Sequence, residues 1–341
     1  MSVTLSSLLY PLAAMATTMT AATLYVYKAN PVRLVRFFLW TSVKLSGMKI
    51  KTTMVEGLRL VYGERGRKQM GRSSILLLHG FSADKSMWAP LCRHLPPDLH
   101  VIALDLPGHG ESQEPSIDAD LSLSAQMEFL HKTIETLGLA TDPIHLVGLS
   151  MGGALAGLYA AEYPQNVERL TMMCPAMKTP VATEISLKIR QIMESGDEEK
   201  IFKECPLIPR NAEEMQYMLD FAQFHKSSFI PKQILEGAVE MRRPYNQYYL
   251  RLFKNLANLK NSQILQNTAH RIKVPTHLVW GEDDQVIHIS GAEVLRQILP
   301  NCQQVDIIPR CGHAINLDRP GSKTKALLKF RGELHLARNK Q

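Results

Sequence analysis

The sequence of 341 residues lacks several patterns that mark common protein classes. Its five cysteines are scattered and odd in number, and they form no C-x-x-C pair, which argues against a disulfide framework and a cysteine-based zinc site. No N-x-[ST] glycosylation acceptor occurs, and neither an H-E-x-x-H motif nor a phosphate-binding loop is present. These absences favour a body that lies in the cytosol.

Acidic residues are missing from the first 55 residues. The basic residues of this segment are Lys28, Arg33, Arg36, Lys44, Lys49 and Lys51. They supply six of the seven net positive charges of the chain, so the remainder is nearly neutral. The high isoelectric point therefore does not indicate a nucleic-acid partner. It indicates a basic N-terminal element whose expected partner is a membrane surface.

A stretch of 23 residues without a charge runs from Leu5 to Tyr27. A helix of that length spans about 34 Å, enough to cross a bilayer core of about 30 Å. A cleaved signal peptide is the alternative, but it requires a positive start, and no Lys or Arg precedes Lys28. We therefore predict a membrane anchor over residues 1–30. Since the positive charges follow the span, the body is expected on the cytosolic side.

Residues 31–55 form a basic juxtamembrane segment in this interpretation. Within Pro31–Lys51, aromatic and aliphatic residues alternate with Arg and Lys, as in a helix that lies in the bilayer interface. A basic linker without a fixed pose is the alternative, and the pattern does not separate the two. All motifs described below follow this segment, so we expect a chain that starts near Lys51 to keep the chemistry.

From about residue 56, short apolar runs alternate with helical patterns. The runs are rich in Ile, Leu and Val, as in parallel strands covered on both faces. They occupy residues 73–80, 100–105, 143–148, 167–174, 275–281 and 303–308. This alternation predicts an α/β fold with a mostly parallel central sheet and helices on both faces. Residues 176–271 hold amphipathic helical patterns only, so we expect a helical cap inserted into a core of residues 56–175 and 272–341.

A single serine stands between glycines where the third of these strands meets a helix. The stretch Gly148-Leu149-Ser150-Met151-Gly152 fits the G-x-S-x-G pattern of a nucleophile elbow, whose strained turn presents the serine hydroxyl to a cleft. In an open α/β sheet that cleft lies beyond the carboxyl ends of the strands. The alternative is a tight structural turn in which the serine has no chemical role.

A serine nucleophile needs a histidine base and an acid that orients it, and on this fold the chain order is Ser, acid, His. Three acidic residues follow the fifth strand, and the offset favours Asp284, with Asp283 second. His313 follows the last strand. His288 is too close to the acid in sequence, and His335 lies in a basic tail. We therefore expect His313 to be the base.

The negative charge that develops on a substrate oxygen also needs backbone donors. The loop His79-Gly80-Phe81 follows the first strong strand, and Met151 opens the helix after the serine. We expect the N–H groups of Phe81 and Met151 to form an oxyanion hole. For His79, and for His109 in a turn-rich loop, we expect structural roles.

In this order, the stretches HGF, DLPGHGES, GLSMGG, WGEDDQV and CGH resemble the motifs of the α/β-hydrolase family. The resemblance extends over most of the chain. It is most specific in the N-terminal segment, in SILLLHGFSADKSMW and in PLIPRNAEEM, which are similar to the single-pass, membrane-anchored monoacylglycerol lipases of that family. It implies a triad of Ser150, Asp284 and His313. One departure is Asp318, where many relatives carry Glu, and we expect it to alter only a loop contact.

The resemblance implies a lipase that faces the cytosol from an endomembrane (endosome, lysosome or ER) or from the plasma membrane. Its substrates would be monoacylglycerols such as 2-arachidonoylglycerol, with lysophospholipids as a second class, and it would need no metal or cofactor. An acyl or protein thioesterase, a C–C bond hydrolase and a non-catalytic membrane-tethered scaffold are the alternatives. Epoxide hydrolases and dehalogenases are disfavoured because they carry an aspartate at the elbow.

Overall fold

The computed structural model describes residues 30–226 and 230–336. The predicted membrane span, Leu5–Tyr27, lies outside these residues. Of the helices in the described ranges, none combines the length and the apolar character that crossing a bilayer requires.

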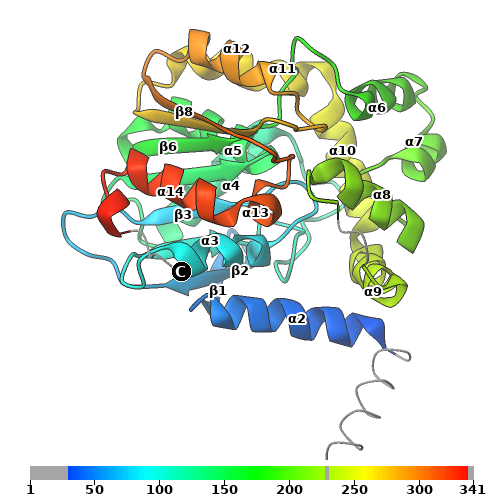
Figure 1. Ribbon diagram of the computed structural model, residues 1–341, viewed down its shortest axis with the longest axis horizontal. Coiled ribbons are helices and arrows are strands. Elements are labelled where there is room, and N and C mark those ends of the chain that lie inside the picture. Colours follow the sequence, from blue (N-terminus) through cyan, green and yellow to red (C-terminus); the bar gives the residue numbers. More distant parts are fainter. Residues whose placement is uncertain (1–29, 227–229, 337–341) are drawn as a thin grey trace, which may run out of the picture.

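Eight strands form one sheet in the order β1-β2-β4-β3-β5-β6-β7-β8 (Figure 1). β2 runs antiparallel to β1 and β4, and the pairs from β4 to β8 are parallel. The prediction of a mostly parallel sheet is therefore confirmed. The strands are β1 (Lys49–Val55), β2 (Leu58–Arg65), β3 (Ile75–Leu78), β4 (Val101–Leu104), β5 (Ile144–Leu149), β6 (Val167–Met173), β7 (Thr276–Gly281) and β8 (Cys302–Ile308).

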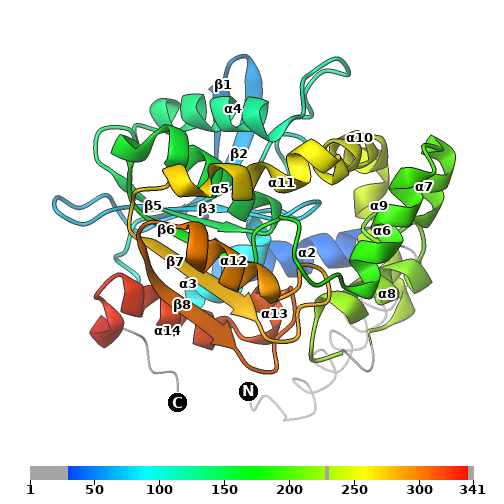
Figure 2. The same cartoon turned by 90° about the horizontal axis from the view of Figure 1, so that it is seen from above.

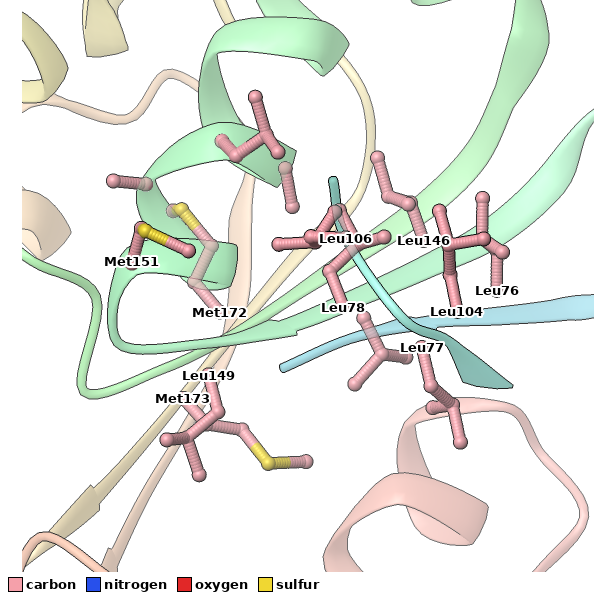
Figure 3. Close-up of a cluster of buried hydrophobic side chains, with 14 of the residues drawn as sticks. Leu76, Leu77, Leu78, Leu104, Leu106, Leu146, Leu149, Met151, Met172 and Met173 are labelled. Carbon is pink, nitrogen blue, oxygen red and sulfur yellow. The ribbon is translucent and has the colours of Figure 1, made fainter. Parts of the chain in front are cut away.

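Helices cover both faces of the sheet, as expected (Figure 2). One face carries α3 (Ala89–His94) and α14 (Pro320–Phe330), which pack on each other. The other carries α4 (Leu123–Thr136), α5 (Met151–Glu162), α11 (Leu259–Thr268) and α12 (Ser290–Ile298). Apolar side chains of the central strands point into both layers. In Figure 3 Leu76 and Leu146 lie on one side of the strands, and Leu77 and Leu149 lie on the other.

The sheet begins earlier in the chain than the sequence pattern predicts. β1 lies inside the range 31–55 expected as juxtamembrane segment, and it joins β2 through a tight turn at Glu56 and Gly57, whose φ angles are 48° and 78°. The alternation is hidden because this edge strand is largely exposed and polar. Met48, just before it, is buried. A chain that starts near Lys51 would therefore lose part of the fold.

α2 (Pro31–Leu45) occupies most of the basic and aromatic stretch for which the sequence left a helix and a linker as alternatives. Asn30 caps it by accepting a 3.2 Å hydrogen bond from the Arg33 N–H, and Pro31 occupies its first turn. The helix runs along the bottom of the molecule in Figure 1, from β1 to the cap helix α9 (Lys232–Arg242). Its contact with α9 is tight, since a Cβ on Gly237 would come within 2.7 Å of the Pro31 carbonyl oxygen.

Between β6 and β7 the described residues form helices and loops only. Besides α9 and α11 these helices are α6 (Glu184–Glu194), α7 (Glu198–Glu204), α8 (Ala212–Ala222) and α10 (Asn246–Ala257). Figures 1 and 2 both show α6 to α10 gathered at one end of the sheet. α11 differs from the others, because it packs against α5 and α12 in the helical layer of the core. The name helical cap is therefore kept below for α6 to α10.

Candidate active site

Ser150 occupies the turn between β5 and α5. Its φ of 55° and ψ of −119° place a residue with a Cβ in a region that favours glycine. Such a conformation costs on the order of 1–3 kcal/mol and persists only where the surroundings enforce it. Here the Ser150 N–H donates to the Met173 carbonyl oxygen at 2.9 Å, and the Ser150 carbonyl accepts from the N–H groups of Ala154 and Ala176. The half-buried serine is thus held at the carboxyl end of the sheet.

The two glycines of the motif are required by close backbone contacts. A Cβ on Gly148 would lie 2.0 Å from the Gly152 carbonyl oxygen. A Cβ on Gly152 would lie 2.4 Å from the carbonyl oxygens of Leu78 and His79. Only a residue without a side chain fits at either position. The pattern that singled out Ser150 in the sequence therefore has a steric cause.

Asp284 and His313 are in direct contact. Asp284 lies in the loop after β7, and His313 lies in the loop between β8 and α13 (Ile315–Asp318). His313 Nδ1 and Asp284 Oδ2 are 2.8 Å apart, and the buried carboxylate also accepts the N–H groups of Val286 and Ile287 at 2.8 and 2.9 Å. The imidazole thus donates its Nδ1 proton and keeps Nε2 available for a second partner. Asp283 does not take this place, and its own N–H donates to the Cys311 carbonyl oxygen at 2.9 Å.

Ser150, Asp284 and His313 all lie at the same edge of the sheet, after β5, β7 and β8. β6 lies between them and links them, since Met173 accepts the Ser150 N–H and the next residue, Cys174, contacts His313. In the described part of the chain, Ser150 Oγ and His313 form no hydrogen bond. A proton-transfer contact of this kind often tightens only when substrate is bound.

The loop after β3 approaches the serine. A Cβ on Gly80 would lie 3.2 Å from the Ser150 Cβ, so the backbone of the next residue, Phe81, passes close to the hydroxyl. Met151 is the first residue of α5, and its N–H is one of those that a helix leaves without an internal partner. The two predicted oxyanion donors therefore belong to the loop next to Ser150 and to the helix that follows it, and their role stays a prediction.

His79 holds this loop in place, as expected from the sequence. Its Nε2 accepts the Leu106 N–H at 2.9 Å, so its Nδ1 carries the proton and donates to the Gly80 carbonyl oxygen at 2.8 Å. Complete burial lowers the pKa of His79 to about 4. His109 packs against His79 with ring centroids 4.8 Å apart, and burial lowers its pKa as well. Both imidazoles are neutral at physiological pH and fit structural roles.

The helical cap packs directly onto the loop after β3 that carries Phe81 and Ser82, called the oxyanion loop below. The Phe81 ring lies 5.7 Å from that of Tyr249 and 6.1 Å from that of Phe253, both on α10. Arg242, at the end of α9, donates to Ser82 Oγ at 2.6 Å and to the Leu207 carbonyl oxygen at 2.9 Å. Aromatic side chains of the cap therefore pack against the loop that lies next to Ser150.

Two residues near the histidine did not emerge from the sequence as parts of the site. The Cys174 thiol, just after β6, lies 3.6 Å from the His313 carbonyl oxygen. Burial and the nearby Asp284 charge raise the pKa of this thiol, so it is a donor and not a thiolate. Its place at the carboxyl end of a strand was the available signal. Asp318 accepts the N–H groups of Gly312 and Phe224 at 2.8 Å each, so it ties the histidine loop to the cap.

Cys174, Asp284 and His313 are also the one candidate metal-ligand group among the described residues, with their ligand atoms within 4.8 Å of one another. An ion at this position would have to replace the hydrogen bond between His313 and Asp284. The arrangement as it stands suits an activated serine with two backbone donors beside it.

Comparison with known proteins points to the same chemistry. A family model described as alpha/beta hydrolase family matches residues 75–326. The chain is 38% identical to monoacylglycerol lipase ABHD6 of Homo sapiens over 306 residues, which are 89% of this chain and 88% of the relative. It is 30% identical to Lipase 1 of Psychrobacter immobilis over 76% of this chain and 77% of that one. Among solved structures, a bacterial membrane phospholipase A matches with a TM-score of 0.77 and 27% identity, covering 97% of this chain and 99% of that one.

Proposed function

Because the chain belongs to the alpha/beta hydrolase family, we propose that it is a serine lipase that hydrolyses the ester bond of monoacylglycerols. The observation that carries the proposal is the arrangement at one sheet edge of a strained serine, a histidine–carboxylate pair and two backbone donors. The likeness to monoacylglycerol lipases over about nine-tenths of both chains supports the choice of substrate.

In the proposed mechanism, each residue of the site has a separate role. Ser150 Oγ attacks the ester carbonyl carbon while His313 Nε2 takes the hydroxyl proton, and Asp284 stabilises the imidazolium that forms. The N–H groups of Phe81 and Met151 stabilise the oxyanion. His313 then gives its proton to the departing glycerol oxygen. A water molecule, deprotonated by His313, attacks the acyl-enzyme and releases the fatty acid.

Lysophospholipids are a second substrate class. The likeness to a membrane phospholipase A over almost the whole of both chains favours it. The two classes share the acyl ester and differ in the head group, so the same triad acts on both. A thioesterase or a C–C bond hydrolase gains no support from an observation of this kind.

The proposal places the enzyme at a membrane, with residues 1–30 as a single-pass anchor and the catalytic body in the cytosol. The outward side of α2 supports membrane contact. Phe37, Phe38, Trp40 and Leu45 expose 63%, 71%, 54% and 69% of their surfaces, and Arg33, Arg36 and Lys44 are exposed beside them. Aromatic residues with basic neighbours are typical of helices in the bilayer interface.

The proposed substrate class is tested with the purified full-length chain in detergent micelles. Released fatty acid is measured for 2-arachidonoylglycerol, a lysophospholipid, a triacylglycerol and an acyl thioester, with Ser150→Ala as the blank. We expect the monoacylglycerol to react fastest and the lysophospholipid to follow. If a serine-directed fluorophosphonate labels Ser150 while the thioester reacts faster than both lipids, the proposed substrate class is wrong.

The membrane part needs a shortened chain that leaves the fold intact. A chain that begins at Asn30 keeps α2 and its cap, whereas a start near Lys51 would not. We expect this chain to hydrolyse a soluble short-chain ester like the full-length protein, and to act more slowly on a monoacylglycerol in anionic vesicles. Equal rates on the vesicles would show that residues 1–29 do not help to deliver substrate.

A further inference from the structure

A basic hollow of about 570 Å³ lies at the end of the β1–β2 hairpin. The name is used here for the cavity whose charged lining consists of Lys49, Lys51, Glu64, Arg65, Arg67 and Lys68. We propose that the basic hollow binds the phosphate group of an anionic membrane lipid. This inference rests on the membrane contact of the proposed function and is independent of the ester chemistry.

The basic hollow is separate from the triad. In the strand register, Lys49 lies opposite Glu64 of β2, and Arg65 lies opposite Val101, the first residue of β4. These positions lie at the amino ends of the parallel strands. Ser150 follows the carboxyl end of β5. The hollow therefore serves a ligand other than the ester that reacts at Ser150.

The charge balance of the hollow favours an anion. Five Lys or Arg side chains line it, against a single carboxylate. That carboxylate, Glu64, is already engaged by an ion pair with Lys51 and by His100 Nε2 at 3.2 Å. Lys68 pairs with Asp142 at 2.6 Å. Lys49 and Arg67 are therefore the lining cations to consider as partners of a bound anion.

Lys49 and Arg67 are the cations that a ligand would meet. Both side chains are exposed, and among residues 30–226 and 230–336 no carboxylate forms an ion pair with either. The lining residues Gly47, Gly66 and Gly138 carry no side chain that would close the hollow. A phosphate bound between an ammonium and a guanidinium accepts charge-assisted hydrogen bonds from both.

The exposed apolar residues next to the hollow favour a lipid over a soluble phosphate as its ligand. Gly47 lines it, and α2 ends two residues earlier at Leu45. Leu45, at the end of α2 next to the hollow, exposes 69% of its surface, and Ile50, between the lining residues Lys49 and Lys51, exposes 39%. α2 is about 22 Å long at 1.5 Å per residue, and its C-terminal end lies next to β1, whose first residues line the hollow (Figure 1). A bilayer that contacts the whole length of α2 would therefore lie close to the hollow.

The test uses the full-length protein in detergent micelles. Binding of a short-chain phosphatidylinositol 4-phosphate and of inorganic phosphate is measured by titration calorimetry for the wild type and for the variant K49Q/R67Q. The matched control is K178Q/K200Q, which removes two exposed lysine charges elsewhere on the surface. We expect the lipid to bind the wild type and the control alike, and K49Q/R67Q about tenfold or more weakly.

Each other result overturns the inference. Equal lipid binding by K49Q/R67Q and K178Q/K200Q would show that the hollow is not the site. Inorganic phosphate that binds as tightly as the lipid would assign the hollow to a soluble anion. The thermal midpoint and the hydrolysis of a soluble short-chain ester are measured in parallel. If the wild-type protein does not hydrolyse the soluble ester, the proposed function is wrong, but the result on lipid binding still stands.

Discussion

The guanidinium of Arg242 donates a 2.6 Å hydrogen bond to Ser82 Oγ, one residue beyond the proposed oxyanion donor Phe81. Arg242 belongs to α9, the cap helix that packs against α2, and Ser82 has a φ of 55°. The strained conformation of the loop is therefore held from the cap. The contact between α9 and α2 can therefore influence the loop that carries Phe81 through this bond.

Replacing Arg242 should impair the chemical step more than substrate binding. For Arg242→Gln we expect kcat to fall about 10- to 100-fold, with little change in KM, because the Phe81 N–H is displaced. Steady-state kinetics on a soluble ester measure both parameters. The control is Arg243→Gln, whose side chain is exposed and pairs with Glu240. A rise in KM at unchanged kcat would indicate that Arg242 shapes the substrate channel instead.

Removal of the nucleophile or the base should abolish hydrolysis. We expect Ser150→Ala and His313→Ala each to lower kcat by about 10³-fold or more, and the double variant to be little worse than either, because such residues act as a unit. Fatty acid release and fluorophosphonate labelling are the measurements. Ordinary turnover by folded Ser150→Ala protein would remove the serine from the mechanism.

The two neighbouring aspartates should behave differently. Asp284→Asn is expected to lower kcat about 10³- to 10⁴-fold while the fold survives, because the imidazole loses the negative charge that orients it. Asp283→Asn should have a mild effect, since among the described residues only the backbone groups of Asp283 have hydrogen-bond partners. Circular dichroism spectra of both variants serve as the folding control. The opposite order of effects would identify Asp283 as the acid.

A buried lysine offers a prediction about stability. Lys323 on α14 is fully buried, and its Nζ has no hydrogen-bond partner among the described residues. Burial holds its pKa well below the usual value, so the folded state binds fewer protons than the unfolded state. Stability should therefore rise with pH from the lowered pKa of the folded state up to about 10.4, the usual lysine value.

Lys323→Met should remove this dependence. At pH 7 we expect the free energy of unfolding to increase by about 1–3 kcal/mol, because an unpaired polar group is no longer buried. The advantage should shrink as the pH rises towards about 10.4, where the unfolded lysine also loses its proton. Denaturant unfolding across this range measures it, with exposed Lys325→Met as control. A variant less stable than the wild type at pH 7 would contradict the expectation.

Several features were readable from the sequence because their causes are local. The parallel strands appear as unbroken apolar runs, since both faces of each strand are buried by helices. Gly148 marks the elbow because the backbone of Gly152, four residues later, leaves no room for a Cβ. β1 was missed for the opposite reason. It is a mostly exposed edge strand, so burial imposes no pattern on it, and its partner β2 defines it.

The sequence pattern alone could not decide which aspartate contacts His313. Asp283 and Asp284 have the same side chain at adjacent positions, so the pattern could only rank them. The structure separates them because Asp283 pairs with Cys311 through its backbone, and the following residue turns inward to His313. Asp318 is a second case, since its link between Gly312 and the end of α8 joins distant segments.

The sequence by itself determined the parallel strands β3 to β8, the insertion of helices before β7 and the order of serine, acid and histidine, because periodicity and chain order are properties of consecutive residues. Only the tertiary structure decided how β1 and β2 extend the sheet, how the cap meets the oxyanion loop through Arg242 and that Lys49 and Arg67 line the same hollow. These relationships join residues far apart in the chain, and their geometry depends on how whole elements pack. No local pattern records that packing, because the contacts form only when the sheet and its helices are assembled.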